Sequence, residues 1–230
     1  MLAKSTADRN PAAFSQAASS QPGCWDKRLA GTIEQPGCQG SSRVAVRKGK
    51  LGRRMYVLLF DIDGTLLSSG GAGQAAMEAA FRREFQKDGP VSGISTAGRT
   101  DYAISRDLFN FYGLPWDDAA WKQFQEAYFE LLPEHLSTRD GLVLPGVLHL
   151  LELLETRDDV ATGLLTGNFN RGAQLKLQHF ALDHHFAFGS YGDLHGHRDD
   201  VARDALRQVK ERHPGVPVER VWVIGDTPAD

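Results

Sequence analysis

Five consecutive apolar residues, Tyr56 to Phe60, run directly into Asp61, Asp63 and Gly64, and this junction limits the possible folds more than any other feature. A short, continuously apolar run that ends in acids and glycine is typical of a strand buried on both faces of a parallel sheet. Parallel strands need helical crossovers, which cover both faces of the sheet. We therefore expect an α/β protein with a parallel sheet as its core.

The rest of the sequence after Phe60 alternates helical and strand patterns. Apolar residues at helical spacing predict helices over 73–85, 102–113, 117–132, 148–154, 173–180 and 201–212. Further strands are expected at 161–165, 186–188 and 221–224. The stretch from 69 to 140 contains no predicted strand, which indicates an inserted helical module. Its core is predicted to consist of aromatic side chains: Phe109, Phe111, Tyr112, Trp116, Trp121, Phe124, Tyr128 and Phe129.

Three regions follow from this pattern. Residues 1–54 are rich in Ser, Gln, Gly, Ala and Pro, repeat Gln-Pro-Gly-Cys at 21–24 and 35–38, and show no periodicity. We expect them to be a disordered or non-native extension, with translation beginning naturally at Met55, and an organelle transit peptide is the alternative. Residues 55–68 and 141–230 are expected to form the core domain, and residues 69–140 a small helical domain.

Composition limits the possible partners and compartment. Residues 1–54 carry a net charge of +7, which leaves −10 on the remainder, and so acidic a body opposes nucleic-acid binding. No apolar run reaches the roughly 18 residues of a membrane helix, and no charged start leads into an apolar signal region. The two cysteines, Cys24 and Cys38, lack the clustering of a zinc site. We expect a cytoplasmic protein, monomeric or homodimeric, without a nucleic-acid or membrane partner.

Three polar clusters follow three predicted strands: 61–65, 166–168 and 225–230. Because ligands of parallel α/β sheets bind at the carboxyl ends of the strands, we expect the clusters to form one site. Asp61 and Asp63 repel each other unless a cation or proton separates them, and Mg²⁺ with oxygen ligands resolves that repulsion. In Thr166-Gly167-Asn168, a hydroxyl and exposed backbone amides suit phosphate oxygens, although the tripeptide is also a good turn.

The three clusters, in this order, resemble the motifs of the haloacid dehalogenase superfamily: Asp-x-Asp-Gly-Thr, a hydroxyl-Gly-Asn strand end, and Gly-Asp-x-x-x-Asp. The resemblance runs from Tyr56 to the end of the chain. The helical block is similar to the small cap domain of the phosphoglycolate-phosphatase-like branch. The resemblance implies a Rossmann-like parallel core and a Mg²⁺-dependent phosphatase that acts on a small phosphorylated metabolite.

The resemblance also implies residue roles. Asp61 corresponds to the nucleophile that forms an aspartyl-phosphate, and Asp63 to the general acid and base, with its backbone carbonyl on the metal. Thr166 corresponds to the phosphate-binding hydroxyl. Asp226 corresponds to the metal ligand of the last motif, so Asp61, Asp63 and Asp226 form the predicted metal set. Asp230 is expected to orient the groups around the metal.

The family also requires a cation beside the phosphoryl group, and the sequence departs here from the commonest Lys-Pro form. Arg198, just before a predicted helix, is favoured for its fixed fork of donors, and Lys176 is the rival. Arg99, in Gly-Arg-Thr-Asp, is expected to reach the substrate, although Thr100 or Asp101 can equally cap a helix there. Five histidines show no metal-ligand spacing: His179, His184, His185, His195 and His197.

Several alternative functions stay open. A phosphosugar mutase or other phosphotransferase would use the same core, whereas a phosphonate-cleaving relative would need a cap lysine, and the cap offers Lys87 and Lys122. Carbon–halogen cleavage does not need the acid at Asp63.

The family continues with another strand and helix after the last motif, so we expect a truncated chain with an exposed apolar edge at 221–224 and poor activity. An inactive binding module is the alternative from another class.

Overall fold

The computed structural model describes residues 55–88, 93–228 and 230. The predictions for residues 1–54, including those for Cys24 and Cys38, lie outside the described residues. No helix in the described part of the chain is both long and apolar enough to cross a membrane.

Four parallel strands form the central sheet in the order β5-β4-β1-β6. They are β1 (Tyr56–Phe60), β4 (Val160–Leu165), β5 (Gly189–Ser190) and β6 (Val221–Ile224). β1 lies between β4 and β6, as its uninterrupted apolar run requires. The predicted parallel α/β core is therefore confirmed, and the carboxyl ends of β1, β4 and β6 meet along one edge.

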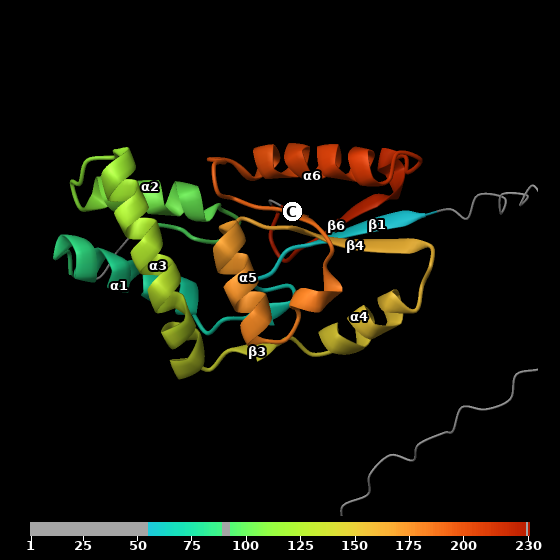
Figure 1. Cartoon of the computed structure of the whole chain (residues 1–230), viewed down its shortest axis with the longest axis horizontal. Coiled ribbons are helices and arrows are strands. Elements are labelled where there is room, and N and C mark those ends of the chain that lie inside the picture. Colours follow the sequence, from blue (N-terminus) through green and yellow to red (C-terminus); the bar gives the residue numbers. More distant parts are fainter. Residues whose placement is uncertain (1–54, 89–92, 229) are drawn as a thin grey trace, which may run out of the picture. The chain divides into compact units, whose positions relative to one another are not determined.

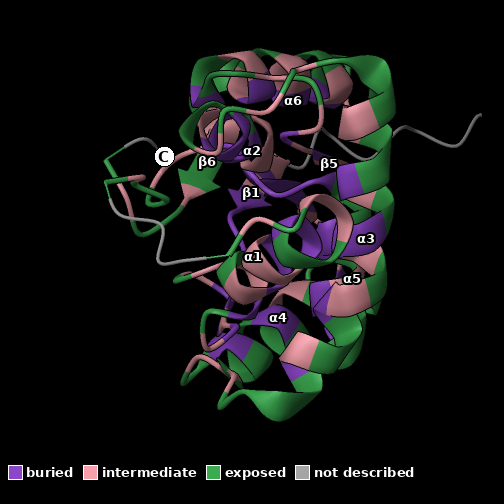
Figure 2. Cartoon of the chain, turned by 90° about the vertical axis from the view of Figure 1, so that its left-hand side faces the viewer, coloured by how far each residue is buried: buried purple, intermediate pink, exposed green. Residues whose placement is uncertain are grey.

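Helices cover both faces of this sheet (Figure 1). On one face, α4 (Val147–Glu155) and α5 (Asn170–His179) bury Val147, Leu151 and Leu177 against Phe60 and Leu164. On the other face, α6 (Arg198–Arg212) contributes a stripe of Val201, Ala205 and Val209 that packs against Val57, Leu59 and Leu165. Alternate residues of β1 thus enter opposite layers, and Figure 2 shows this strand buried among the helices.

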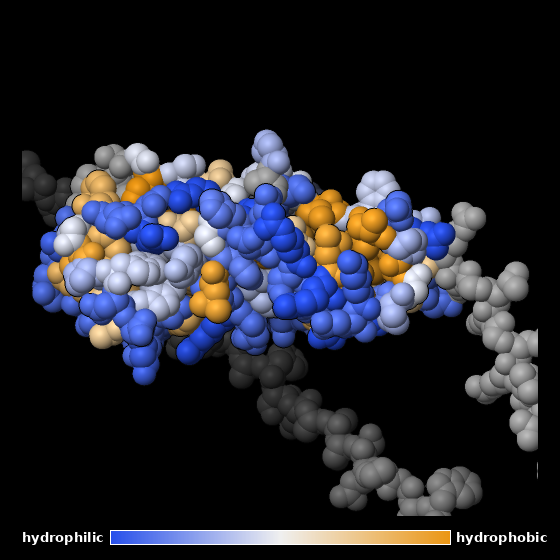
Figure 3. Space-filling view, turned by 90° about the horizontal axis from the view of Figure 1, so that it is seen from above, coloured by the Kyte–Doolittle hydropathy of each residue, from blue (hydrophilic) through white to orange (hydrophobic). Residues whose placement is uncertain are grey.

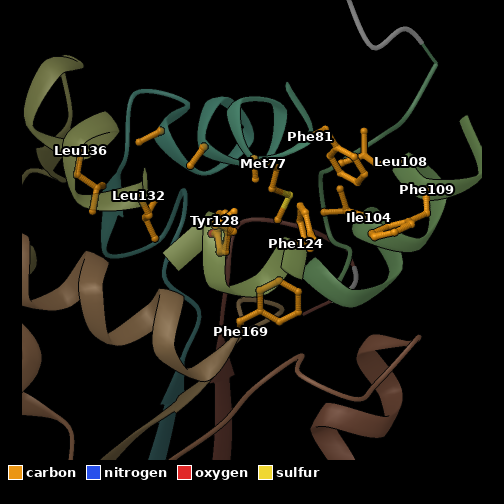
Figure 4. Packing of buried hydrophobic residues seen from close by; sticks show 14 residues of the cluster. Met77, Phe81, Ile104, Leu108, Phe109, Phe124, Tyr128, Leu132, Leu136 and Phe169 are labelled. Carbon is orange, nitrogen blue, oxygen red and sulfur yellow. The ribbon is translucent and has the colours of Figure 1, made fainter. Parts of the chain in front are cut away.

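The helices α1 (Ala72–Phe85), α2 (Asp101–Phe111) and α3 (Asp118–Thr138) share a separate aromatic cluster. Figure 4 shows Phe81, Phe109, Phe124 and Tyr128 side by side, with Phe169 below them. Phe169 belongs to the loop after β4, so this cluster joins the three helices to the sheet domain. Two short strands, β2 (Leu67–Ser68) and β3 (Leu142–Val143), pair antiparallel where the chain leaves the core and where it returns. The predicted domain boundaries stay a prediction.

Some predicted elements are wrong in detail. The helix predicted to end before Pro133 continues to Thr138, because Leu132 and Leu136 are buried on either side of the proline. The predicted strand 186–188 is displaced to Gly189–Ser190, where pairing with β4 occurs. The helices predicted at 173–180 and 201–212 begin three residues earlier. Phe111 is exposed rather than part of the aromatic core.

The strand β6 forms one edge of the sheet, next to the short 3₁₀ turn Val218–Arg220. Trp222 is 57% exposed and Val223 38% exposed. Figure 3 shows hydrophobic surface gathered beside the hydrophilic outer face of α6, in the region of this strand. The prediction of an exposed apolar edge at 221–224 is confirmed.

Candidate active site

The loop after β1 directs its two aspartates to different partners. Asp61 is buried, and its backbone N–H donates to the carbonyl of Ile224 in β6 over 2.9 Å. Ile62 is fully buried below the loop. Gly64 then turns the chain with a φ of +83°, and a side chain there would collide with the carboxylate of Asp226. This glycine therefore serves both the left-handed turn and the close approach of the third strand end.

Asp63 accepts hydrogen bonds from three side chains. Its Oδ2 is 2.5 Å from Lys176 Nζ and 2.9 Å from Asn168 Nδ2, and its Oδ1 is 3.0 Å from Ser69 Oγ. Burial alone would raise the pKa of Asp63, but the charge of Lys176 and these hydrogen bonds outweigh it, so the pKa lies below the ordinary 3.8. Asp63 is therefore an ionised carboxylate in the protein without substrate.

Lys176 lies on α5 and is almost completely buried, with 5% of its side chain exposed. Burial disfavours its charge, yet Asp63 and then Asp101 raise its pKa above the ordinary value. Its ammonium also donates to Asn168 Oδ1 over 2.6 Å. Asn168 and Lys176 therefore hold the carboxylate of Asp63 in one orientation.

Asp61 has a different environment, which is shaped by Arg198. The guanidinium lies 3.5 Å from Asp61 Oδ1 and also donates to Asp230. Burial raises the pKa of Asp61, and Arg198 and a hydrogen bond with Thr166 offset part of this. Both rival cations thus reach the site, but each serves a different aspartate: Arg198 lies against Asp61, and Lys176 against Asp63.

Three carboxylates could hold a cation. Oxygen atoms of Asp61, Asp226 and Asp230 all lie within 4.8 Å of one another. Three hard oxygen donors suit Mg²⁺, which prefers few protein carboxylates and keeps several waters. The side chain of Asp63 bonds to Lys176 instead, so the predicted metal role of Asp63 is left to its backbone carbonyl. Asp230, predicted to orient other groups, lies among the possible ligands.

A cavity of about 280 Å³ joins these groups to the helical region. Its lining includes both aspartates, both cations, Asp226, Gly167 and Asn168, together with Gln74, Met77, Glu78 and Arg99 from the predicted cap. Arg99 lines the cavity while pairing with Asp107 over 2.7 Å. Thr166 is fully buried behind the lining, where its hydroxyl accepts from Asn168 Nδ2 over 2.8 Å.

Asp101 fastens the predicted cap to the loop after β4. Its backbone N–H donates to the Gly167 carbonyl over 2.7 Å, and its Oδ2 accepts from the backbone N–H of Phe169 over 2.9 Å. Burial raises the pKa of Asp101 to about 6, against the lowering effect of Lys176. Thr100, not Asp101, is the N-cap of α2, because its hydroxyl accepts from Ala103 N.

Sequence reasoning missed two contributors to the site. Ser69 carries no motif signal, since it lies beyond the predicted loop and reaches Asp63 only through the β2 turn. Asp101 stood in the string Gly-Arg-Thr-Asp and was interpreted only as a possible helix cap. The close approach of Gly167 to the backbone of Arg99, where a side chain would collide, explains why glycine follows Thr166.

Comparisons with known proteins bear on the fold and the family. The sequence profile described as haloacid dehalogenase-like hydrolase matches residues 58–230. A predicted phosphoglycolate phosphatase from Haemophilus somnus superposes with a TM-score of 0.59 at 17% identity, over 77% of this chain and 79% of its own. A hydrolase from Pseudomonas syringae gives 0.57 at 23% identity, over 75% and 77%. CbbY from Rhodobacter sphaeroides, solved with phosphate, gives 0.56 at 18% identity, over 74% and 76%.

No curated protein sequence matches the chain. At these identities the structures show a shared fold. The parallel sheet and the carboxylates at its strand ends define a Rossmann-like α/β protein with an acidic, cation-lined centre. The profile match over three quarters of the residues then gives the family: the chain belongs to the haloacid dehalogenase-like hydrolases.

Proposed function

We propose that the protein is a Mg²⁺-dependent phosphatase that hydrolyses a small phosphorylated metabolite through an aspartyl-phosphate on Asp61. The observation that carries the proposal is the unequal environment of two aspartates on one strand end. Asp61 lies with Arg198 among the three grouped carboxylates, whereas Asp63 lies outside that group and is held by Lys176. A carboxylate within a metal-binding group suits attack on phosphorus, and a carboxylate outside that group suits proton transfer.

In the first step, a carboxylate oxygen of Asp61 attacks phosphorus while the bond to the leaving alcohol oxygen breaks. Asp63 gives the alcohol its proton. Because its pKa is lowered in the free protein, Asp63 must gain that proton when the substrate binds, and the negative phosphoryl group raises the pKa of a neighbouring carboxylate. The product of the step is an aspartyl-phosphate and the free alcohol.

In the second step, Asp63 accepts a proton from water as the water oxygen attacks phosphorus and the bond to Asp61 breaks. Phosphate leaves, and Asp61 is again a carboxylate. Mg²⁺ bound by Asp61, Asp226, Asp230 and the backbone carbonyl of Asp63 would supply neutralisation of charge on the phosphoryl oxygens. Arg198 offsets charge beside the nucleophile.

The cavity supports a small substrate and the exclusion of bulk water. Its volume of about 280 Å³ is enclosed partly by the predicted cap, from which Met77, Ile104 and Leu108 contribute apolar walls. A dry, low-dielectric cavity strengthens the interactions of Arg198 and Lys176 with a phosphoryl group. Polar residues of the predicted cap line the cavity where the leaving alcohol would lie: Gln74, Glu78, Thr96, Arg99 and Asp101.

The alternatives differ in what they require of these residues. A phosphonate-cleaving enzyme needs a lysine that forms an imine in the cavity, yet Lys87 and Lys122 are not among the lining residues, and Lys122 is 76% exposed. A phosphosugar mutase or phosphotransferase would share the aspartyl-phosphate and differ only in the acceptor. An inactive binding module would retain the cavity without turnover.

A screen of small phosphate esters with the full chain, with Mg²⁺ and after chelation, tests the proposal. We expect phosphate release that requires Mg²⁺ and disappears in Asp61→Asn. Transfer of the phosphoryl group to a second sugar without phosphate release would favour a mutase. Metal-independent release, or no turnover of any ester while phosphate still binds, would contradict the phosphatase.

A further inference from the structure

A second group of metal-binding side chains lies at the opposite end of the sheet. Glu155 is the last residue of α4, just before β4, and His184 and His185 form part of the 3₁₀ turn Asp183–His185, just before β5. These connections lead into the amino ends of their strands, whereas the acidic centre occupies the carboxyl ends. The group shares no residue with the lining of the active-site cavity.

The three side chains are already close together. One ligand atom from each of Glu155, His184 and His185 lies within 4.8 Å of the other two. His185 Nδ1 is 2.6 Å from Glu155 Oε1, and the two imidazole rings lie 4.0 Å apart between centroids with a tilt of 37°. The side chains of Glu155 and His184 are exposed and can rotate to place their donor atoms about 2.0–2.2 Å from one ion.

The anchor of the group is rigid. Only 5% of the His185 side chain is exposed, against 53% for Glu155. The hydroxyl of Thr162, in β4, donates to the His185 carbonyl over 2.8 Å, and the His185 N–H donates to the Leu182 carbonyl. The buried histidine is therefore held by the sheet itself, and the two exposed ligands close over it.

The donor atoms select a different kind of ion from the acidic centre. Two imidazoles and one carboxylate suit Zn²⁺ and Cu²⁺, which bind nitrogen donors far better than Mg²⁺ does. The three residues line a surface hollow together with Arg157, Arg212 and His213. Three protein ligands with an open position are a common arrangement for zinc.

We propose that Glu155, His184 and His185 form a transition-metal site of the Zn²⁺ type at the amino end of the sheet. The bound ion would join the end of α4 to the connection before β5. A hydrogen bond between His185 and Glu155 alone would need no second imidazole. His184 therefore distinguishes a metal site from a structural pair.

Calorimetric titration of the full chain with Zn²⁺ tests this proposal. Excess Mg²⁺ keeps the three-carboxylate centre occupied, and a Cys24→Ser/Cys38→Ser background removes thiol ligands. We expect one Zn²⁺ per chain, bound at least about tenfold more weakly by His184→Ala and by Glu155→Gln, since loss of even an outer partner costs that much. His149→Ala, which removes an exposed histidine from the same α4 helix, is the matched control and should bind like the parent.

Copper provides a second readout that does not depend on stability. The electron paramagnetic resonance spectrum of bound Cu²⁺ should show coupling to imidazole nitrogen, and His184→Ala should reduce the number of coupled nitrogens. Equal Zn²⁺ affinity in the parent, His184→Ala and Glu155→Gln would overturn the proposal. So would the absence of any imidazole coupling to copper.

Discussion

The two ends of the central sheet carry charged side chains of different chemistry. At the carboxyl end, Asp61, Asp226 and Asp230 offer oxygen donors only, and the buried Arg198 pairs with Asp61 and Asp230. At the amino end, Glu155, His184 and His185 offer mostly nitrogen donors beside a surface hollow. The same parallel sheet thus presents hard oxygen donors at one end and borderline nitrogen donors at the other.

The difference comes from the connections at each end. The loops that leave β1 and β4 line the cavity together with α1 and α2, so Asp61 and Asp63 need internal cations. At the amino end, Glu155 and His184 are exposed and need no internal cation, and the buried His185 pairs with Glu155. If this comparison is correct, changes at the carboxyl end alter turnover and changes at the amino end do not.

The largest expected effect is at Asp61. Asp61→Asn keeps the size of the side chain and removes the nucleophilic carboxylate, and losing a covalent nucleophile costs about 10⁴-fold or more in kcat. Steady-state phosphate release with the best ester of the screen measures it. Glu126→Gln, which changes an exposed acid of α3 outside the cavity lining without changing its size, should retain most of the turnover. A loss in Glu126→Gln as large as in Asp61→Asn would refute the assignment.

The second largest expected loss of turnover is at Asp63. Asp63→Asn should lower kcat about 10²- to 10⁴-fold, the usual range for losing general acid and base catalysis. The loss should be smaller for an aryl phosphate, because its leaving group needs little protonation. Comparing kcat for aryl and alkyl esters in both proteins measures this difference. An equal loss for both esters would assign Asp63 to metal binding instead.

Removal of Lys176 should affect stability as well as turnover. Lys176→Met leaves Asp63 and Asp101 without their cation, and breaking a buried pair costs about 3–5 kcal/mol. We expect about 2–3 kcal/mol, because the Asp63 side chain is 38% exposed to the cavity and partly screened. Urea unfolding measures the change, with Lys122→Met on the exposed face of α3 as control. A loss no larger than that of the control would show that the pair contributes little.

Titration of Asp101 should make the stability of the parent depend on pH, and Asp101→Asn should lack this contribution. Its pKa is raised to about 6 in the folded protein, so its neutral form contributes stability that is fully present below the ordinary 3.8 and is lost as pH rises through about 6. Asp101→Asn keeps an acceptor for the Phe169 N–H but does not titrate. The difference in Tm, parent minus variant, should therefore fall as pH rises across this window. A difference that rises with pH would mean that Lys176 lowers the pKa of Asp101 below 3.8.

The smallest expected effect on catalysis is at the amino end. Glu155→Gln and His184→Ala should keep kcat and KM within about twofold of the parent, since distant sites couple by less than about 0.5 kcal/mol. The ester assay measures this in the presence of Mg²⁺ and without zinc. A larger change would mean that the two ends of the sheet are coupled, and the comparison would fail.

The sequence allowed the sheet and the acidic centre to be predicted because both depend on local signals. An apolar run that ends in acids predicts a buried strand and a site at its carboxyl end, and β1 with Asp61 fulfils that pattern. The partners of these groups depend on tertiary contacts. Lys176 contacts Asp63 across 113 positions of the sequence, and Arg198 contacts Asp61 across 137. Sequence spacing could not show these contacts, so it left Lys176 and Arg198 as rivals for one phosphate-binding role. His184 and His185 showed no metal spacing, because their third partner, Glu155, comes from another helix.

Trapping the covalent intermediate tests the central claim most directly. The full chain is mixed with Mg²⁺ and its best ester, quenched during turnover and reduced with borohydride, which converts an aspartyl-phosphate to homoserine, and the peptides are then read by mass spectrometry. The account predicts homoserine at Asp61 in the parent, a larger yield in Asp63→Asn, and none in Asp61→Asn. Turnover without any modification of Asp61, or modification of another residue, would contradict it.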